Sequence, residues 1–159
     1  MTPKQLFQRV QTELKAMVWG VTANKVFGDS VYITPEVPIQ QLALYQSPTA
    51  FIIDQGAPCD GEHPGILYQS FSVTIFVENY QCAKGEGVMV GAIRTANTSQ
   101  GAGILDIEDE FLSKMVEIIT MTTKAMLVEK NAPKVQIVGG NNFPAVLRAF
   151  NFTAITSIY

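Results

Sequence analysis

The sequence predicts a soluble domain in which helices pack on a β-sheet, and three observations support this fold class. Residues 101–124 show the spacing of a long amphipathic helix with a wide apolar face, and residues 3–19 show a second such pattern. Residues 66–78 and 146–159 alternate apolar and polar side chains, as β-strands do. A wide apolar helix face has to lie against a large surface, and a sheet is the simplest such surface.

The composition fits a single domain over residues 1–159 whose surface is partly covered by partner chains. The chain has 159 residues, of which 47% are hydrophobic and only 16% are charged, whereas a charged share of about 25% is usual. A chain of this length can bury a core without disulfides or metals. The net charge is −3 and no basic run occurs, which argues against sequence-specific DNA binding.

Neither a targeting signal nor a cysteine pair is predicted. The N-terminus enters an amphipathic pattern instead of the apolar run of a signal peptide, and no stretch approaches the roughly 20 apolar residues that span a membrane. Cys59 and Cys82 match no metal or redox spacing, so free thiols are expected.

Four acids occupy residues 104–110, while bases dominate residues 1–30 and 124–159. These patches could pair between identical subunits, or they could simply cap helices and solvate the surface.

The first helix is predicted over residues 3–19. Thr2 can cap it, Pro3 suits the first helical position, and Gln5 completes a capping box. Trp19 is expected to close the helix together with the glycine that follows it. The apolar face recurs at helical spacing in Leu6, Val10, Leu14 and Val18.

Strands are predicted in the first half of the chain where apolar runs end at Pro or Gly. Residues 31–33 and 50–54 fit this description, and residues 42–45 fit either a short strand or a turn. Residues 55–65 are rich in Gly and Pro and form a predicted loop. The strongest strand follows at 66–78, with one apolar face made by Phe71, Val73, Ile75 and Val77. Its other face is polar apart from Phe76.

The main helix is predicted over residues 101–124. Asp106 is the expected N-cap, with Asp109 three residues on, and the acids at 108–110 would lie in the first turn, near the positive end of the helix dipole. The predicted buried stripe is Ile107, Phe111, Met115 and Ile118, widened by Leu112, Val116 and Ile119.

The remaining segments are a long connection and a set of C-terminal strands. Residues 79–103 are rich in Gly, Asn, Gln and Ala, and we expect a weakly structured connection with one short element at 88–90. The last strand alternates over its whole length, so it needs neighbours on both sides or a place at the sheet edge. Strands are expected at 125–128, 134–138 and 146–159, with a loop at 139–144.

Three stretches invite a chemical interpretation, and each has a structural alternative. His63 lies in a Gly- and Pro-rich loop with Asp60 nearby, so this loop could hold a metal or could simply be solvated. Residues 85–91 contain three glycines, but neither their spacing nor the preceding Lys84 fits a phosphate loop, and a flexible loop is predicted. The acids at 106–110 could form an acid–base or cation site, although helix capping explains them. The sequence therefore indicates no catalytic, cofactor-binding or metal-binding residue.

The order of several short motifs resembles a known family. After the N-terminal helix come the extended segment Tyr-Ile-Thr-Pro-Glu-Val-Pro at 32–38, a Pro-x-Ala-x-Ile strand at 48–52 and the alternating strand at 69–77. The sequence Gly-Ile-Leu-Asp-Ile-Glu at 103–108 then opens the main helix, and Arg-Ala-Phe-Asn-Phe at 148–152 lies in the last strand. Over most of its length the chain resembles the tail terminator or tail-completion proteins of long-tailed bacteriophages, also described as minor tail or neck proteins.

This resemblance implies an α+β fold in which two main helices pack on one face of a mostly antiparallel β-sheet. It implies a structural virion protein that is not an enzyme, needs no cofactor and is assembled in the cytoplasm of a bacterial host. Such proteins form a ring, expected here to be a homohexamer, which caps the head-proximal end of the tail tube, ends tube polymerisation and provides the head-joining surface. The implied partners are further copies of the chain, the tail tube protein, and a head–tail connector or head-completion protein. DNA would only pass through the lumen, and no membrane is involved.

Within such a ring, contacts are expected at the loop 85–94, at the loop 56–65 and on the exposed side of the last strand. Met89 could contact a partner or could instead fill a small satellite core. Alternative functions are another neck or tail component, such as a head-completion protein or tail-tube subunit, and, from a different class, a small-ligand-binding or hydrolytic domain. The individual interface candidates are Tyr80, Gly85, Glu86, Gly87, Met89 and Arg94.

Overall fold

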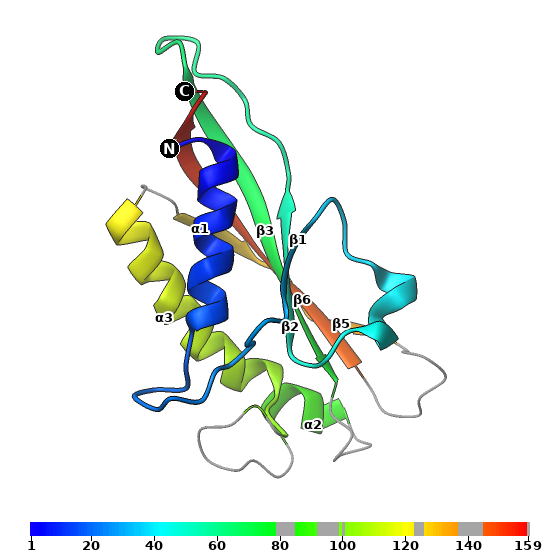
Figure 1. The fold of residues 1–159 in the computed structure, drawn as a ribbon. Helices are drawn as coiled ribbons and strands as arrows, with labels where there is room; N and C mark the ends of the chain where they lie inside the picture. The colour runs from blue at the N-terminus through cyan, green and yellow to red at the C-terminus, as the bar shows by residue number, and fades with distance from the viewer. Residues whose placement is uncertain (79–84, 92–98, 100, 123–125, 137–144, 159) are drawn as a thin grey trace.

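The computed structural model has an α+β fold with one six-stranded sheet and two main helices, α1 and α3, on one face of it (Figure 1). It describes residues 1–78, 85–91, 99, 101–122, 126–136 and 145–158. The predicted fold class is confirmed, because every strand pair except β1–β2 is antiparallel. The elements are α1 (Pro3–Ala16), β1 (Val31–Thr34), the 3-10 helix η1 (Ile39–Leu44), β2 (Thr49–Asp54), β3 (Ile66–Glu78), α2 (Gly85–Val90), α3 (Ile104–Thr122), β4 (Met126–Lys130), β5 (Lys134–Gln136) and β6 (Ala145–Ser157).

The two long strands β3 and β6 form the centre of the sheet. They pair along their whole length, from Ile66 with Ser157 to Glu78 with Ala145. The strand order is β1-β2-β3-β6-β4, and β5 also pairs with β6. Because β3 occupies one side of β6 completely, β4 and β5 lie one after the other along its other side. The last strand therefore has neighbours on both sides, and β4 with β5 forms the outer edge of the sheet.

The main hydrophobic core lies between the sheet and the helices α1 and α3. On α3 the predicted stripe is confirmed for four residues, which are at most 4% exposed: Ile107, Phe111, Met115 and Ile118. Phe111 packs against Phe150 with ring centroids 4.9 Å apart, so α3 contacts the central strand directly. The expected widening of this stripe is wrong for Val116, which is 62% exposed. Leu112 is only partly buried against the core.

A second, smaller core covers part of the opposite face of the sheet. Leu42 of η1 is buried there among Phe51, Phe76, Ala145 and Leu147. This cluster explains why Phe76 interrupts the polar face of β3, since the 3-10 helix shields that position from solvent. The stretch predicted as a short strand or a turn thus belongs mostly to η1, which ends at Leu44.

The first helix has the predicted start but ends earlier than expected. Thr2 and Gln5 form both hydrogen bonds of the capping box. The helix ends at Ala16, because Met17 has an extended backbone with ψ 132°. Trp19 does not close the helix but lies in a turn, where its backbone N–H donates to Asn24. Trp19 is 1% exposed, and its Nε1 donates to Ser99 Oγ at 3.0 Å.

The start of α3 differs from the prediction by three residues. The helix begins at Ile104, so Asp106 is its third residue and not the N-cap. The Asp106 carboxylate nevertheless accepts the backbone N–H of Gly103 at 3.0 Å, which is the returning half of a capping box. Asp109 is exposed and lies beyond the first turn, so it has no capping position.

Candidate interaction surfaces

The interface candidates predicted between residues 80 and 94 fall into two groups. Tyr80 and Arg94 lie outside the described residues. Gly85, Glu86 and Gly87 belong to the short helix α2, so the prediction of a flexible loop at 85–91 is wrong for residues 85–90. Met89 is partly buried and packs against the main core. The short element expected at 88–90 is the second half of this helix.

Helix α2 is held against the start of α3 by two glycines. A Cβ atom on Gly103 would lie 2.4 Å from the backbone nitrogen of Gly91 and 2.5 Å from the carbonyl carbon of Met89. Gly91 itself has a φ of 79° and lies where a side chain would meet Asp106 and the backbone of Gly101. The two backbones can approach this closely only because both positions lack a side chain. This contact fixes the end of α2 at the head of the main helix.

The acids at the start of α3 form separate contacts within the fold. Glu108 is only 6% exposed and accepts hydrogen bonds from Arg148 at 2.7 Å and from Lys130 at 2.6 Å. Asp106 binds the backbone of Gly103, and Glu110 accepts the backbone N–H of Gly20 at 3.2 Å. These carboxylates therefore join α3 to β6, to β4 and to the turn after α1, instead of converging on one point.

The loop between β2 and β3 extends beyond the sheet at the end where the two termini lie (Figure 1). Asp60 organises this loop: its carboxylate accepts the backbone N–H groups of Glu62 and His63, and also the Tyr68 hydroxyl at 2.9 Å. His63 Nδ1 lies 3.0 Å from the same carboxylate. The backbone bond from Glu62, followed by the Tyr68 bond, lowers the pKa of Asp60 to about 2. The described part of the chain contains no group of three His, Cys, Asp or Glu side chains that could hold a metal ion.

The outer edge formed by β4 and β5 exposes large apolar side chains. Met126 is 64% exposed, Val128 61% and Val135 76%, and Leu127 is also exposed. The amino-acid sequence does not predict this surface, because an apolar run such as Met-Leu-Val usually indicates a buried strand. Only the strand order places this run at the edge of the sheet.

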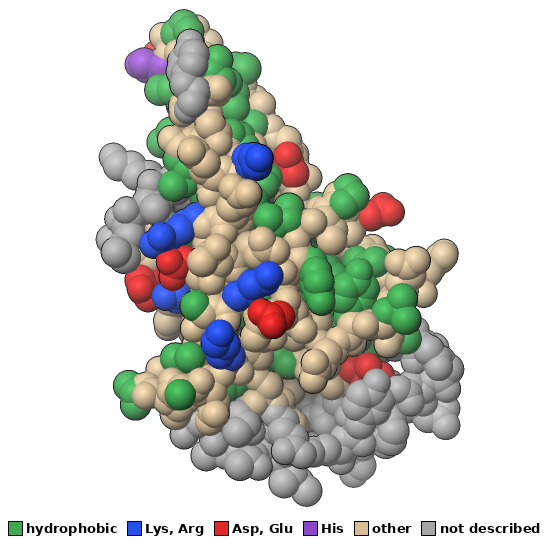
Figure 2. Space-filling view, viewed as in Figure 1, with side chains coloured by type: hydrophobic (Ala, Val, Ile, Leu, Met, Phe, Trp, Pro, Cys, Tyr) green, Lys and Arg blue, Asp and Glu red, His purple; other side chains and the backbone are tan. Residues whose placement is uncertain are grey.

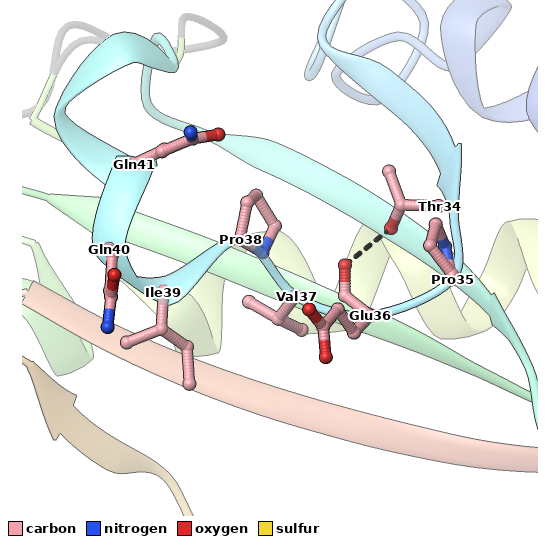
Figure 3. Close-up of a pocket in the computed structure, with 8 residues that line it drawn as sticks. All are labelled: Thr34, Pro35, Glu36, Val37, Pro38, Ile39, Gln40 and Gln41. Carbon is pink, nitrogen blue, oxygen red and sulfur yellow. Dashed lines mark hydrogen bonds between the residues drawn. The ribbon is translucent and has the colours of Figure 1, made fainter.

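The sheet edge opposite β4 and β5, at β1 and the neighbouring helix η1, exposes a second apolar surface. Figure 2 shows hydrophobic side chains gathered on the side of the molecule where these two elements lie. A hollow of about 810 Å³ is lined by residues 34–41, which run as one arc from the end of β1 to the start of η1 (Figure 3). The exposed apolar side chains here are Tyr32, Ile33, Ile39 and Leu44.

The predicted contact surface on the last strand is less apolar than these two. On the face of β6 away from the helices, Asn151 and Thr153 are half-buried and Ile155 is 42% exposed. Each of the two sheet edges carries four exposed large apolar side chains, whereas Ile155 is the one such side chain on this face of β6 among its described residues.

No protein-family model matches the sequence, and no curated protein matches it significantly. Among the described residues, no helix is both long and apolar enough to cross a membrane.

Proposed function

We propose that the chain is a structural virion protein of a long-tailed bacteriophage that forms a ring on the head-proximal end of the tail tube. The observation that carries this proposal is the apolar outer edge made by β4 and β5. Exposed apolar side chains that gather on one surface often mark a site that binds another protein, so such an edge favours burial by another chain. The α+β fold with both main helices on one face is also the fold that the family resemblance implies.

The proposed mechanism is steric. Identical subunits that contact one another through two different surfaces form a closed ring when the rotations from each subunit to the next add up to one full turn. The ring, expected to be a hexamer, would cover the growing face of the tail tube and replace it with a face for the head–tail connector or head-completion protein. DNA would pass through the lumen, which suits a chain with net charge −3. This mechanism requires no catalytic residue and no cofactor.

The test is the mass of the purified protein, measured with and without tail tubes and combined with electron microscopy. We expect rings of about six subunits, either free in solution or only on the tube ends. Long cylinders formed by the protein alone would identify a tube subunit instead and would contradict a terminator. A large, saturable rise in melting temperature with a metal or a nucleotide would favour the ligand-binding or hydrolytic alternative.

A further inference from the structure

We infer that neighbouring subunits meet edge to edge, with the β4–β5 edge of one subunit packed on the β1–η1 surface of the next. This inference rests on the proposed ring and names the two surfaces that form it. The β4–β5 edge is defined by residues 126–136 and the β1–η1 surface by residues 31–45.

The two surfaces lie at opposite edges of one sheet. β1 ends the strand order on one side, and β4 with β5 ends it on the other. A protomer with different apolar surfaces on opposite sides makes head-to-tail contacts, which generate rings or filaments. A single apolar edge would instead favour a two-fold dimer.

The two surfaces also lie at the same height along the strands. Lys134 on β5 pairs with Leu147, which in turn pairs with Phe76 on β3. Phe76 packs under η1 in the second core. One row of the sheet thus runs from β5 to the strands beneath η1. Subunits related by rotation about an axis parallel to the strands would bring these surfaces together without any rise, as a closed ring requires.

The surfaces are complementary in charge as well as apolar. Glu36 is the only charged residue in the segment 31–45, and it is exposed on the lining of the hollow. Of the three charged residues on the opposite edge, Lys130 pairs with Glu108 and Glu129 accepts a hydrogen bond from Asn151. The third, Lys134, is exposed, and no ion pair engages it among the described residues. Lys134 lies on the face of the sheet that η1 covers, because it pairs with Leu147 of the second core. An acid on one surface therefore matches a base on the other.

Side-chain packing, not a continuous intersubunit sheet, is the contact that these edges allow. Val31 already donates its backbone N–H to Asp29 and accepts the Gln11 side chain at 2.9 Å. Pro35 follows β1 directly, and a register shift and Pro133 interrupt the opposite edge. Such features block strand addition. The exposed Ile39 and the β4–β5 apolar side chains remain free to interlock across the contact.

Cysteine cross-linking tests which surfaces meet. In a chain with both native cysteines changed to serine, the variant Ile39→Cys/Lys134→Cys is treated with a short bismaleimide under ring-forming conditions. We expect a ladder of covalent oligomers that ends at the ring size, and no cross-linking with either single variant. The matched control, Gln8→Cys/Lys134→Cys, places one cysteine on the exposed side of α1 and should remain monomeric on a denaturing gel.

The outcomes separate this inference from the proposed function. Rings seen by microscopy without a ladder would overturn the surface assignment and leave the ring proposal intact. Cross-linked dimers from Lys134→Cys alone would show a two-fold edge contact, which also overturns it. If no ring forms either alone or on tail tubes, both the function and the interface are wrong.

A charge exchange gives an independent readout at the same contact. Glu36→Lys and Lys134→Glu should each raise the subunit dissociation constant by about 2- to 5-fold, the range for an exposed ion pair. The double exchange should restore the original value. Additive weakening in the double variant would contradict a direct pairing of these two residues.

Discussion

Arg148 on β6 and Glu108 on α3 form a buried ion pair, in which Nη1 donates to Oε2 at 2.7 Å. Lys130 on β4 binds the other carboxylate oxygen of Glu108 at 2.6 Å. One carboxylate therefore joins the main helix to the central strand and to the outer edge of the sheet. The Arg148 Nε is buried without a hydrogen bond in the described structure, so Glu108 is the main compensation for this buried charge.

Loss of the Glu108 charge should strongly destabilise the fold. Glu108→Gln leaves the Arg148 cation buried and uncompensated, and breaking a buried pair in this way costs about 3–5 kcal/mol. Lys130 is 43% exposed at its side chain, so the control Lys130→Gln should cost about 1 kcal/mol or less. Urea unfolding followed by circular dichroism measures both free energies. Equal losses in the two variants would show that the Arg148 contact has no special weight.

A methyl group at Gly103 should force α2 away from α3. The added Cβ would lie 2.4–2.5 Å from the backbone of Gly91 and Met89, and relieving such overlap costs about 1–3 kcal/mol. Gly61→Ala is the control, because a Cβ at Gly61 meets nothing within 4 Å. Thermal unfolding of both variants tests this. A Gly103→Ala protein as stable as the control would mean that the two segments are not in contact.

Prediction from the sequence succeeded where the signal is local. The β3 boundaries are predicted at 66–78 as observed, because the middle of the strand alternates from Phe71 to Ile75. The capping box of Thr2 and Gln5 was predicted because its two hydrogen bonds join residues three positions apart. Only the second half of α2 is predicted, as the short element at 88–90, since Gly85 and Gly87 have low helix propensity. Its close contact with α3 is a tertiary effect that local sequence does not encode.

The ion pair of Glu108 and the exposed β4–β5 edge were harder to predict, because both depend on contacts between residues that are distant in the sequence. A glutamate near a helix start looks the same in the sequence whether it caps the helix or pairs with a distant arginine. The partner of Glu108 is 40 residues away and is brought near only by the strand order. Likewise, residues 126–128 have the composition of a buried strand, and their exposure follows from their place at the sheet edge.

Truncation within the buried stripe of α3 should be far more costly than truncation beside it. Phe111 is fully buried, so Phe111→Ala should destabilise by about 3–5 kcal/mol. Val116 is 62% exposed on the same helix, and Val116→Ala should change stability by no more than about 0.5 kcal/mol. Urea unfolding compares the stabilities of the two variants through their midpoints, provided that the dependence of the unfolding free energy on urea concentration is the same in both. A loss below about 1 kcal/mol for Phe111→Ala would show that this helix face is not core.

The capping role of Asp106 makes a smaller, separate prediction. Its carboxylate accepts the Gly103 N–H at 3.0 Å, so Asp106→Ala should cost about 1 kcal/mol, the usual value for a lost cap. Asp109 is exposed beyond the first turn, and Asp109→Ala should be close to neutral. Thermal unfolding of the two variants ranks them. A larger loss of stability in Asp109→Ala than in Asp106→Ala would show that Asp109, not Asp106, caps the helix.

Acid should loosen the loop between β2 and β3 at a pH that Asp60 sets. The pKa of Asp60 is lowered from 3.8 to about 2, first by the Glu62 backbone N–H and then by the Tyr68 hydroxyl. A lowered pKa means that the native loop favours the carboxylate. Its contribution to loop order is therefore complete above pH 3.8 and is lost as the pH falls through about 2.

The 13C chemical shift of the Asp60 side-chain carboxyl carbon, followed by nuclear magnetic resonance from pH 6 to pH 1, measures this change directly. We expect it to titrate with a midpoint of about 2 in the native protein and with a higher midpoint in Tyr68→Phe, which lacks the hydroxyl that donates to Asp60. The exposed Asp109→Asn variant is the control and should keep the native titration. A midpoint near 3.8 would mean that the hydrogen bonds from Glu62 and Tyr68 do not hold the carboxylate in solution.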